Sequence, residues 1–129
     1  MPSIERPLSG DVLVFALDAE RQQAADEAIL ERSGRNARTL LKDGPLRVTL
    51  VVLGRGGEIQ EHQADGPITV QPLDGEVRFT VGDRFFDIGP GELLSAGAGV
   101  RHAVASKEGA AFLLTVARPA EAAPTEAAA

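Results

Sequence analysis

Residues 76–88 read EVRFTVGDRFFDI, and this stretch indicates the fold class. Apolar side chains occupy every second position from Val77 to Val81, with polar side chains between them. Alternation with a period of two is typical of a half-buried β-strand, because successive side chains of a strand point to opposite faces. Gly82 and Asp83 follow, and glycine tolerates the positive φ that a tight hairpin turn requires. The stretch therefore predicts a strand, a tight turn and a second strand.

The same character extends on both sides, as short β-rich segments separated by glycine and proline. We predict further strands at residues 37–43, 46–53, 58–64, 67–73, 92–96, 100–106 and 111–117. In one of these strands the even-numbered residues from Leu46 to Val52 form a wholly apolar face. The pair Asp74-Gly75 predicts another hairpin turn. Many short strands joined by regular turns predict an all-β sandwich or barrel.

The chain begins with a segment of different character. Residues 18–33, DAERQQAADEAILERS, are rich in helix formers and predict one helix, with Asp18 as its N-cap and Gly34 at its end. Its narrow apolar stripe consists of Ala25, Ala28, Ile29 and the aliphatic stem of Arg32. Because so narrow a stripe buries little surface, we expect the helix to pack outside the main core or against a partner subunit.

A length of 129 residues suits a single domain, with 43% hydrophobic and 25% charged residues as in globular proteins. We divide the chain into an N-terminal extension with the helix (1–35), a β-barrel (36–117) and a tail (118–129) whose low complexity predicts disorder. No apolar run reaches the roughly 18–20 residues that span a bilayer, and the first residues lack the pattern of a secretory signal. We therefore expect a cytoplasmic protein without membrane association.

Charge and cysteine content narrow the function. The net charge is -6, from 19 acidic and 13 basic residues, so nucleic-acid binding, which needs clustered Lys and Arg, has no support. A small molecule is the expected partner. Arg47, Arg78 and Arg84 alternate with apolar residues, a pattern typical of solvated strand faces rather than of an anion site. Since the chain has no cysteine, any metal must be bound by nitrogen and oxygen ligands.

His62 and His102 are the only histidines of the chain. Two groups of residues surround them at set intervals: Gly56, His62, Ala64, Ile68 and Gly75, and then Gly91, Gly97, Gly99, His102 and Ser106. These groups resemble the two signatures of the cupin superfamily, over roughly residues 47–116. In that family a histidine stands in place of Ala64, a glutamate in place of Ile68, a proline in place of Gly97 and an asparagine in place of Ser106. The resemblance implies a cupin-type double-stranded β-helix, a jelly-roll barrel, here with a short N-terminal helix.

The predicted strands place both histidines at one pocket. Side chains within residues 58–64 repeat every two positions, so Gln60, His62 and Ala64 are expected to share a face. A barrel brings this strand and the strand of His102 around one cavity, and the mouth of a β-barrel is a common ligand site. We therefore expect His62 and His102 to be neighbours that bind a small molecule together with Gln60.

The resemblance also implies a metal site of three histidines and one glutamate, of which this chain keeps His62 and His102. A catalytic metal normally has about three protein ligands, and Gln60 is the candidate third ligand because of its expected face. Gln71 lies on the strand that carries the glutamate in the family and is included among the ligand-binding residues, although its odd spacing from Ile68 predicts the opposite face. The cofactor is then one divalent transition metal (Fe, Zn, Ni or Mn), or none.

Three interpretations of the histidines stay open at this point. The first is a metal-dependent enzyme of the oxygenase, isomerase or lyase type, with both rings as metal ligands and no catalytic residue assigned. The second is a non-catalytic small-molecule-binding or sensory protein with a degenerate metal site. The third is a pair of structural histidines. The resemblance further implies a homodimer, with additional strands near residues 10–16 and 36–42 at the contact.

Overall fold

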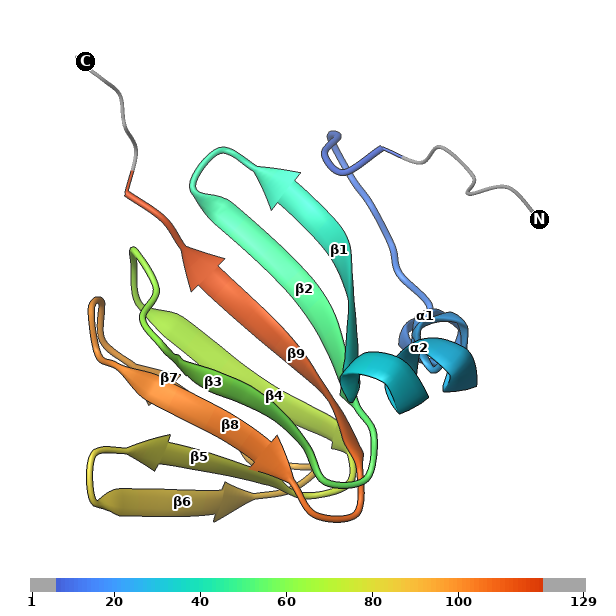
Figure 1. Cartoon of the computed structure of the whole chain (residues 1–129). Helices are drawn as coiled ribbons and strands as arrows, with labels where there is room; N and C mark the ends of the chain where they lie inside the picture. The colour runs from blue at the N-terminus through green and yellow to red at the C-terminus, as the bar shows by residue number, and fades with distance from the viewer. Residues whose placement is uncertain (1–6, 120–129) are drawn as a thin grey trace.

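The computed structural model describes residues 7–119 and consists mainly of β-strands (Figure 1). Its elements are α1 (Leu17–Ala24), α2 (Glu27–Ser33), β1 (Arg35–Asp43), β2 (Leu46–Leu53), β3 (Gly57–His62), β4 (Ile68–Asp74), β5 (Val77–Val81), β6 (Arg84–Ile88), β7 (Leu94–Ala96), β8 (His102–Ser106) and β9 (Ala110–Ala117). They form two antiparallel sheets, in the orders β1-β2-β9-β4-β7 and β3-β8-β5-β6. Each strand predicted within the barrel, residues 36–117, is present, with its ends within two residues of the expected ones. The all-β jelly-roll prediction is confirmed.

The main core fills the space between the two sheets. It consists of Val51, Leu53, Ile68, Val70, Val77, Phe79, Val104, Ala110 and Phe112. The predicted apolar side of β5 belongs to it, since Val77 and Phe79 are 0% and 1% exposed. In β2, Val51 and Leu53 point into this core. Leu50 and Val52 of the predicted apolar face are buried in a second cluster on the opposite side of the sheet, whereas Leu46 of the same face is 40% exposed.

Two predicted turns have different outcomes. Gly82 has a φ of +61° and joins the hairpin partners β5 and β6, as predicted. Asp74-Gly75 is not a hairpin turn, because β4 pairs with β7 and β9 while β5 pairs with β6 and β8. The segment instead carries the chain from one sheet to the other. Gly75 has a φ of +76°, and a Cβ atom there would lie 2.3 Å from the carbonyl oxygen of Gly109, so only glycine fits this crossing.

The predicted single helix is two helices, α1 and α2. Asp26 caps the second one, because the backbone N–H of Ile29 donates to its Oδ1 atom at 3.2 Å. Asp18 lies inside α1 and is not its N-cap, which is Ala16 without a side-chain hydrogen bond. Gly34 follows α2 with a φ of +78°, as expected of a helix end.

The helices cover the outer face of the five-stranded sheet at β1 and β2 (Figure 1). Ala24, not the predicted Ala25, is the buried residue of α1, at 2% exposure. It packs with Leu40, Leu50, Val52 and Ala111 in the second cluster. The prediction that the helical segment packs outside the main core is therefore confirmed, but with different residues.

The strand expected near residues 10–16 is not present. This segment has no strand assignment. Just before it, the carbonyl of Leu8 accepts a hydrogen bond from the backbone N–H of Lys42 in β1 at 2.7 Å. The tail expected to be disordered falls almost wholly outside the described residues, from position 120 onward. Within residues 7–119, no helix has the length and apolar character needed to cross a bilayer.

Candidate functional site

The structure brings His62 and His102 together at the end of the four-stranded sheet. The two residues are direct partners across the antiparallel pair β3 and β8. Their ring centroids are 4.4 Å apart and the ring planes meet at 63°, an edge-to-face arrangement. Two imidazoles far apart in the sequence thus form one pair.

A β-bulge in β3 decides which side chains accompany this pair. Ile59 pairs with Val104 and His62 with His102, so β3 uses one residue more than β8 between these two pairs. The extra residue reverses the alternation, and His62 points to the same side as Ile59, which packs against the main core. The prediction that Gln60 shares the face of His62 is therefore wrong.

The side chain of Gln60 lies on the outer face of the sheet. Its Nε2 atom donates to Oε1 of the exposed Glu58 at 3.3 Å. Arg101 and Glu61 also meet outside the barrel, with 3.3 Å between guanidinium and carboxylate, so Arg101 points away from its neighbour His102 as expected. Only the backbone carbonyl of Gln60 contacts the ring of His62. The side chain of Gln60 is therefore not placed to bind a metal ion together with the two histidines.

His102 is buried and neutral. It is 3% exposed, and its ring stacks on Phe79 with 4.7 Å between centroids and 19° between planes. Burial lowers the pKa of His102 below its ordinary value of 6.5, with a smaller contribution from the neighbouring His62 and an opposing one from the hydrogen bond to the carbonyl of Val100. The uncharged form of the ring is therefore favoured at neutral pH.

Both rings are oriented by the backbone in the same way. Nδ1 of His62 lies 2.9 Å from the carbonyl oxygen of Gln60, and Nδ1 of His102 lies 3.0 Å from that of Val100. A carbonyl oxygen only accepts, so each Nδ1 carries a hydrogen and donates it. Each Nε2 then presents a lone pair, which can accept a hydrogen bond or bind a metal ion.

The remaining residues do not complete a metal site. Ile68, at the position of the family's glutamate, is 3% exposed in the main core, and Ala64 packs against that core. Gln71 is exposed, on the face of β4 opposite to the buried Ile68 and Val70. No group of three or more His, Cys, Asp or Glu that could hold a metal ion occurs in residues 7–119. Because a catalytic metal normally has about three protein ligands, this donor set does not fit one.

The strand registers define a layer of inward-facing side chains around the histidines, which we name the mouth layer. It consists of Arg47, Val116, Ile68 and Ala96 from the five-stranded sheet and His62, His102, Val81 and Arg84 from the other. Arg47 faces inward because it shares the alternation of Val51 and Leu53. The mouth layer contains two arginines, two histidines and no acidic side chain.

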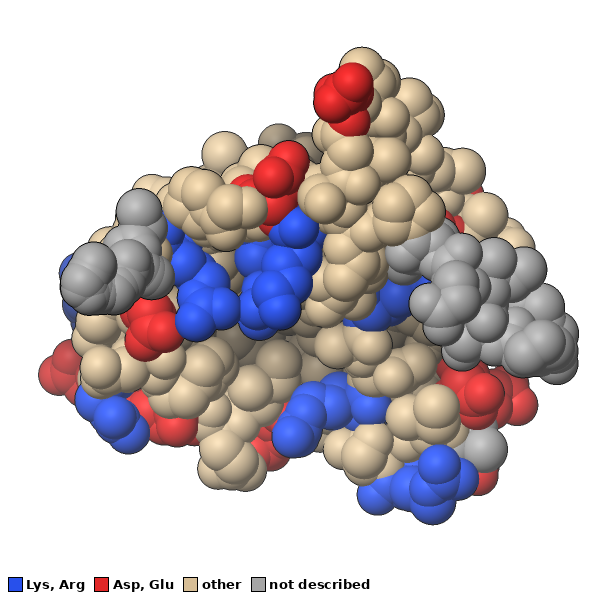
Figure 2. All heavy atoms as spheres, turned by 90° about the horizontal axis from the view of Figure 1, so that it is seen from above, with Lys and Arg blue, Asp and Glu red and all other residues tan. Residues whose placement is uncertain are grey.

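A cavity of about 290 Å³ opens at this layer between the edge strands β6 and β7. It is lined by Phe79, Val81, Arg84, Phe86, Leu94, Ser95, Ala96 and Val100. Neither histidine is among the lining residues, but Phe79, which is, stacks on His102 and so adjoins both the cavity and the histidine pair. In the face seen from above, Lys and Arg side chains border a hollow, although the chain as a whole is acidic (Figure 2).

Two arginines that the sequence assigned to solvated faces belong to this site. Arg84 and Arg47 point into the barrel, whereas Arg78 points outward as expected. The sequence around Arg84 is ambiguous because Phe85 and Phe86 give both faces of β6 an aromatic residue. The pairing of Arg84 with the inward-facing Val81 resolves the direction.

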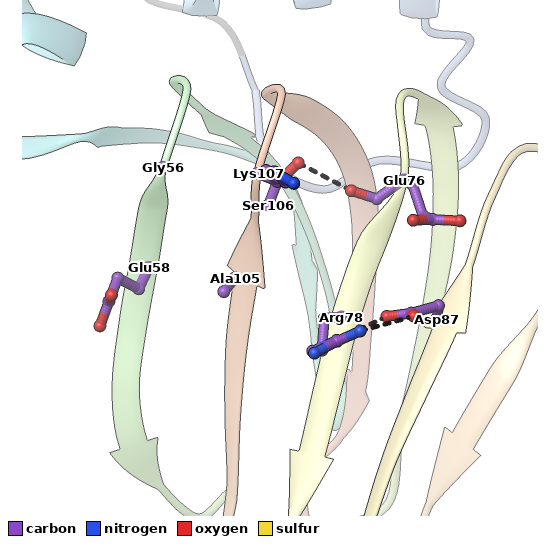
Figure 3. A pocket seen from close by; sticks show the side chains of 8 residues that line it. All are labelled: Gly56, Glu58, Glu76, Arg78, Asp87, Ala105, Ser106 and Lys107. Atoms are coloured by element: carbon purple, nitrogen blue, oxygen red, sulfur yellow. Dashed lines mark hydrogen bonds and ion pairs between the residues drawn. The ribbon is translucent and has the colours of Figure 1, made fainter.

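A larger hollow, of about 420 Å³, lies on the outer face of the four-stranded sheet and is shown in Figure 3. Two of its charges are paired, since Arg78 donates twice to Asp87, at 2.8 and 2.9 Å. The hydroxyl of Ser106, at the position of the family's asparagine, donates to the carbonyl of Glu76 at 2.7 Å. Because its arginine and its serine are already engaged, this hollow is the weaker candidate.

No protein-family model and no curated protein sequence matches the chain. Solved structures do resemble it. A conserved protein of unknown function from Streptococcus pyogenes has 28% identity and a TM-score of 0.63, over 69% of this chain and 78% of that one. A cupin superfamily protein from Desulfitobacterium hafniense has 22% identity and a TM-score of 0.63, over 66% and 78%. A cupin-2 domain containing protein from Shewanella frigidimarina has 16% identity and a TM-score of 0.66, over 81% and 95%.

Proposed function

Because this chain belongs to the cupin superfamily, we propose that its barrel binds a small organic molecule at the mouth layer without a resident metal ion. The imidazoles of His62 and His102 are the hydrogen-bonding contact in this proposal. The cavity between β6 and β7 supplies the space for the rest of the ligand.

The histidine pair is the observation that carries the proposal. Backbone carbonyls hold both Nδ1 atoms, which leaves both Nε2 lone pairs for a ligand. Nε2 of the buried His102 can accept a hydrogen bond from a ligand hydroxyl or amide, and such a bond is stronger in the low dielectric of the barrel interior than in water. The exposed His62 beside it provides the second acceptor on the solvent side.

A metal-dependent enzyme is the less supported function. It requires a third protein ligand, but an apolar side chain occupies the position of each missing ligand and the side chain of Gln60 lies outside the barrel. No triad of nucleophile, base and orienting acid accompanies the histidines in the described residues, since their ring nitrogens contact backbone carbonyls. Binding without turnover therefore agrees best with the side chains at the site.

The test compares variants of two residues of β3 that lie two positions apart and, because of the bulge, on opposite faces of the sheet. Untagged protein is screened against a panel of small metabolites by thermal unfolding, and then His62→Ala and Gln60→Ala are screened with the compounds that stabilise the wild type. His62→Ala should lose the stabilisation and Gln60→Ala, on the outer face, should keep it. Stabilisation that survives in His62→Ala would place the ligand elsewhere.

Elemental analysis of the same preparation tests the proposal that the protein has no resident metal ion. We expect less than about a tenth of an equivalent of iron, zinc, nickel or manganese, because two imidazoles alone bind such ions weakly. A stoichiometric transition metal in the untagged protein would instead support the enzyme.

We further propose that two copies of the chain associate through the edge of the five-stranded sheet. Val12 and Val14 are 82% and 89% exposed in an extended segment, and β1 is the last strand of its sheet. An extended segment with exposed apolar side chains beside the edge strand of a sheet is a surface that a second copy of the chain can cover. Sedimentation should show a dimer that Val12→Ser with Val14→Ser dissociates, whereas Leu93→Ser, exposed elsewhere, leaves it intact. A monomeric wild type would remove this proposal.

A further inference from the structure

We propose that the ligand of the mouth layer is a small organic carboxylate with an apolar body, and that Arg84 binds its carboxylate. This inference rests on the proposed function and names the class of ligand. The cavity between β6 and β7 has one charged residue among apolar walls, and the mouth layer around it has no acid.

Arg84 is a guanidinium without a carboxylate partner. It faces into the barrel beside Val81, and its guanidinium carbon lies 5.5 Å from the ring centroid of Phe86. The arginines on the outer face of the same sheet are paired: Arg78 with Asp87 and Arg101 with Glu61. In residues 7–119 no ion pair of this kind reaches Arg84. A planar guanidinium at a cavity is suited to bind a carboxylate through two parallel hydrogen bonds.

The walls of the cavity select the body of the ligand. Phe79, Phe86 and Leu94 lie one layer below Arg84, and each contributes apolar surface. The volume of about 290 Å³ lies at the lower end of ligand pockets, which span roughly 300–1,000 Å³. An inorganic anion would leave these walls without contacts, so an aryl or alkyl carboxylate fits better than phosphate or sulfate.

A second cation faces the site from the opposite sheet. Arg47 points into the barrel from β2, and its Nε atom is buried without a hydrogen-bond partner. Its position adds positive potential at the mouth layer in a chain whose net charge is -6. The barrel mouth therefore favours an anion although the chain as a whole is acidic.

The same ligand can reach the histidines. Arg84 and His102 lie on β6 and β8, with β5 between them, so their strands are two spacings apart, about 10 Å. A carboxylate at Arg84 and a hydroxyl at the far end of an aryl group match this separation. The ligand then uses the cation at one end and the Nε2 acceptors at the other.

The experiment uses 3-(4-hydroxyphenyl)propanoate and its neutral amide, titrated into the full-length protein by calorimetry. The carboxylate should bind at least about tenfold more tightly than the amide, since it gains charge-assisted hydrogen bonds. Arg84→Gln should abolish that preference. Arg101→Gln removes the same charge at the same end of the barrel, but on the outer face, and should preserve it.

The possible results separate this inference from the proposed function. Equal affinity of the two compounds, or a preference that persists in Arg84→Gln, overturns the carboxylate assignment while binding that depends on His62 still supports the proposed function. If neither compound binds, the inference is also overturned, and the metabolite screen with His62→Ala then decides the proposed function on its own. If Arg101→Gln loses the preference as much as Arg84→Gln, general charge and not a site explains it, which overturns the inference as well.

Discussion

The inner and outer faces of the four-stranded sheet carry similar residues in opposite states. On the outer face Arg78 pairs with Asp87 and packs over Phe85, with 3.8 Å from its guanidinium carbon to the ring centroid. On the inner face Arg84 has no carboxylate, and the histidine pair has unused Nε2 atoms. Charged side chains that are paired with one another need no ligand, so they indicate an ordinary solvent-exposed surface. Charges and lone pairs that lack partners at a cavity indicate a site that a ligand completes.

Removing an aromatic ring from each face should give the largest difference. Phe79→Ala should lower the free energy of unfolding by about 3–5 kcal/mol, because Phe79 is 1% exposed and its loss leaves a core cavity. Phe85→Ala, at 55% exposure on the outer face, should cost less than about 1 kcal/mol. Urea unfolding of the two variants checks this. Equal losses would mean that the outer face is covered by another molecule.

Restoring a ligand should affect metal binding on the inner face alone. Ala64→His adds an imidazole at the position where the family has one, on a residue that packs against the core. We expect its affinity for Zn²⁺ to exceed that of the wild type by at least about tenfold, because three protein ligands approach the usual number. Gln60→His, on the outer face, is the matched control and should leave the affinity unchanged. A gain in both variants would place the metal outside the barrel.

The period-two pattern predicted most of the fold because it depends only on which residues are apolar. It located the strands of the barrel and the turn at Gly82. It did not separate the two sheets, so Asp74-Gly75 was expected to be a hairpin turn although β4 and β5 belong to different sheets. Sheet membership depends on long-range pairing that no local pattern contains.

The site was less predictable for a related physical reason. The meeting of the two histidines followed from the family resemblance, but the bulge in β3 inverted the faces that alternation assigned to Gln60 and His62. One inserted residue exchanges every side chain beyond it between the two faces, and the composition of the strand does not mark it. Arg84 was assigned to a solvated face because β6 has a phenylalanine on each side.

The pH dependence of stability should also distinguish the inner face. Burial lowers the pKa of His102, so below its unfolded value of about 6.5 the unfolded chain binds more protons than the folded one. The free energy of unfolding should therefore decrease as the pH falls from about 6.5 toward the lowered pKa of the folded state. Above about pH 6.5 this group should not change the free energy of unfolding. Urea unfolding between neutral and mildly acidic pH should show the loss in the wild type and a smaller one in His102→Gln. Identical slopes would mean that the ring is accessible to protons in the folded state.

The smallest effect should come from removing one arginine from each face in the absence of ligand. Arg78→Gln should lower the melting temperature slightly, because it breaks two hydrogen bonds to Asp87 that water can largely replace. Arg84→Gln should leave the melting temperature unchanged or raise it, since Arg84 contributes no ion pair and its removal relieves an unpaired charge at the barrel mouth. Calorimetric scans should measure the melting temperatures of the two variants at low ionic strength, because salt would screen the ion pair between Arg78 and Asp87. An arginine that binds a ligand does not need to contribute to stability. A clear loss of stability in Arg84→Gln would instead mean that Arg84 has a structural role, as Arg78 has on the outer face.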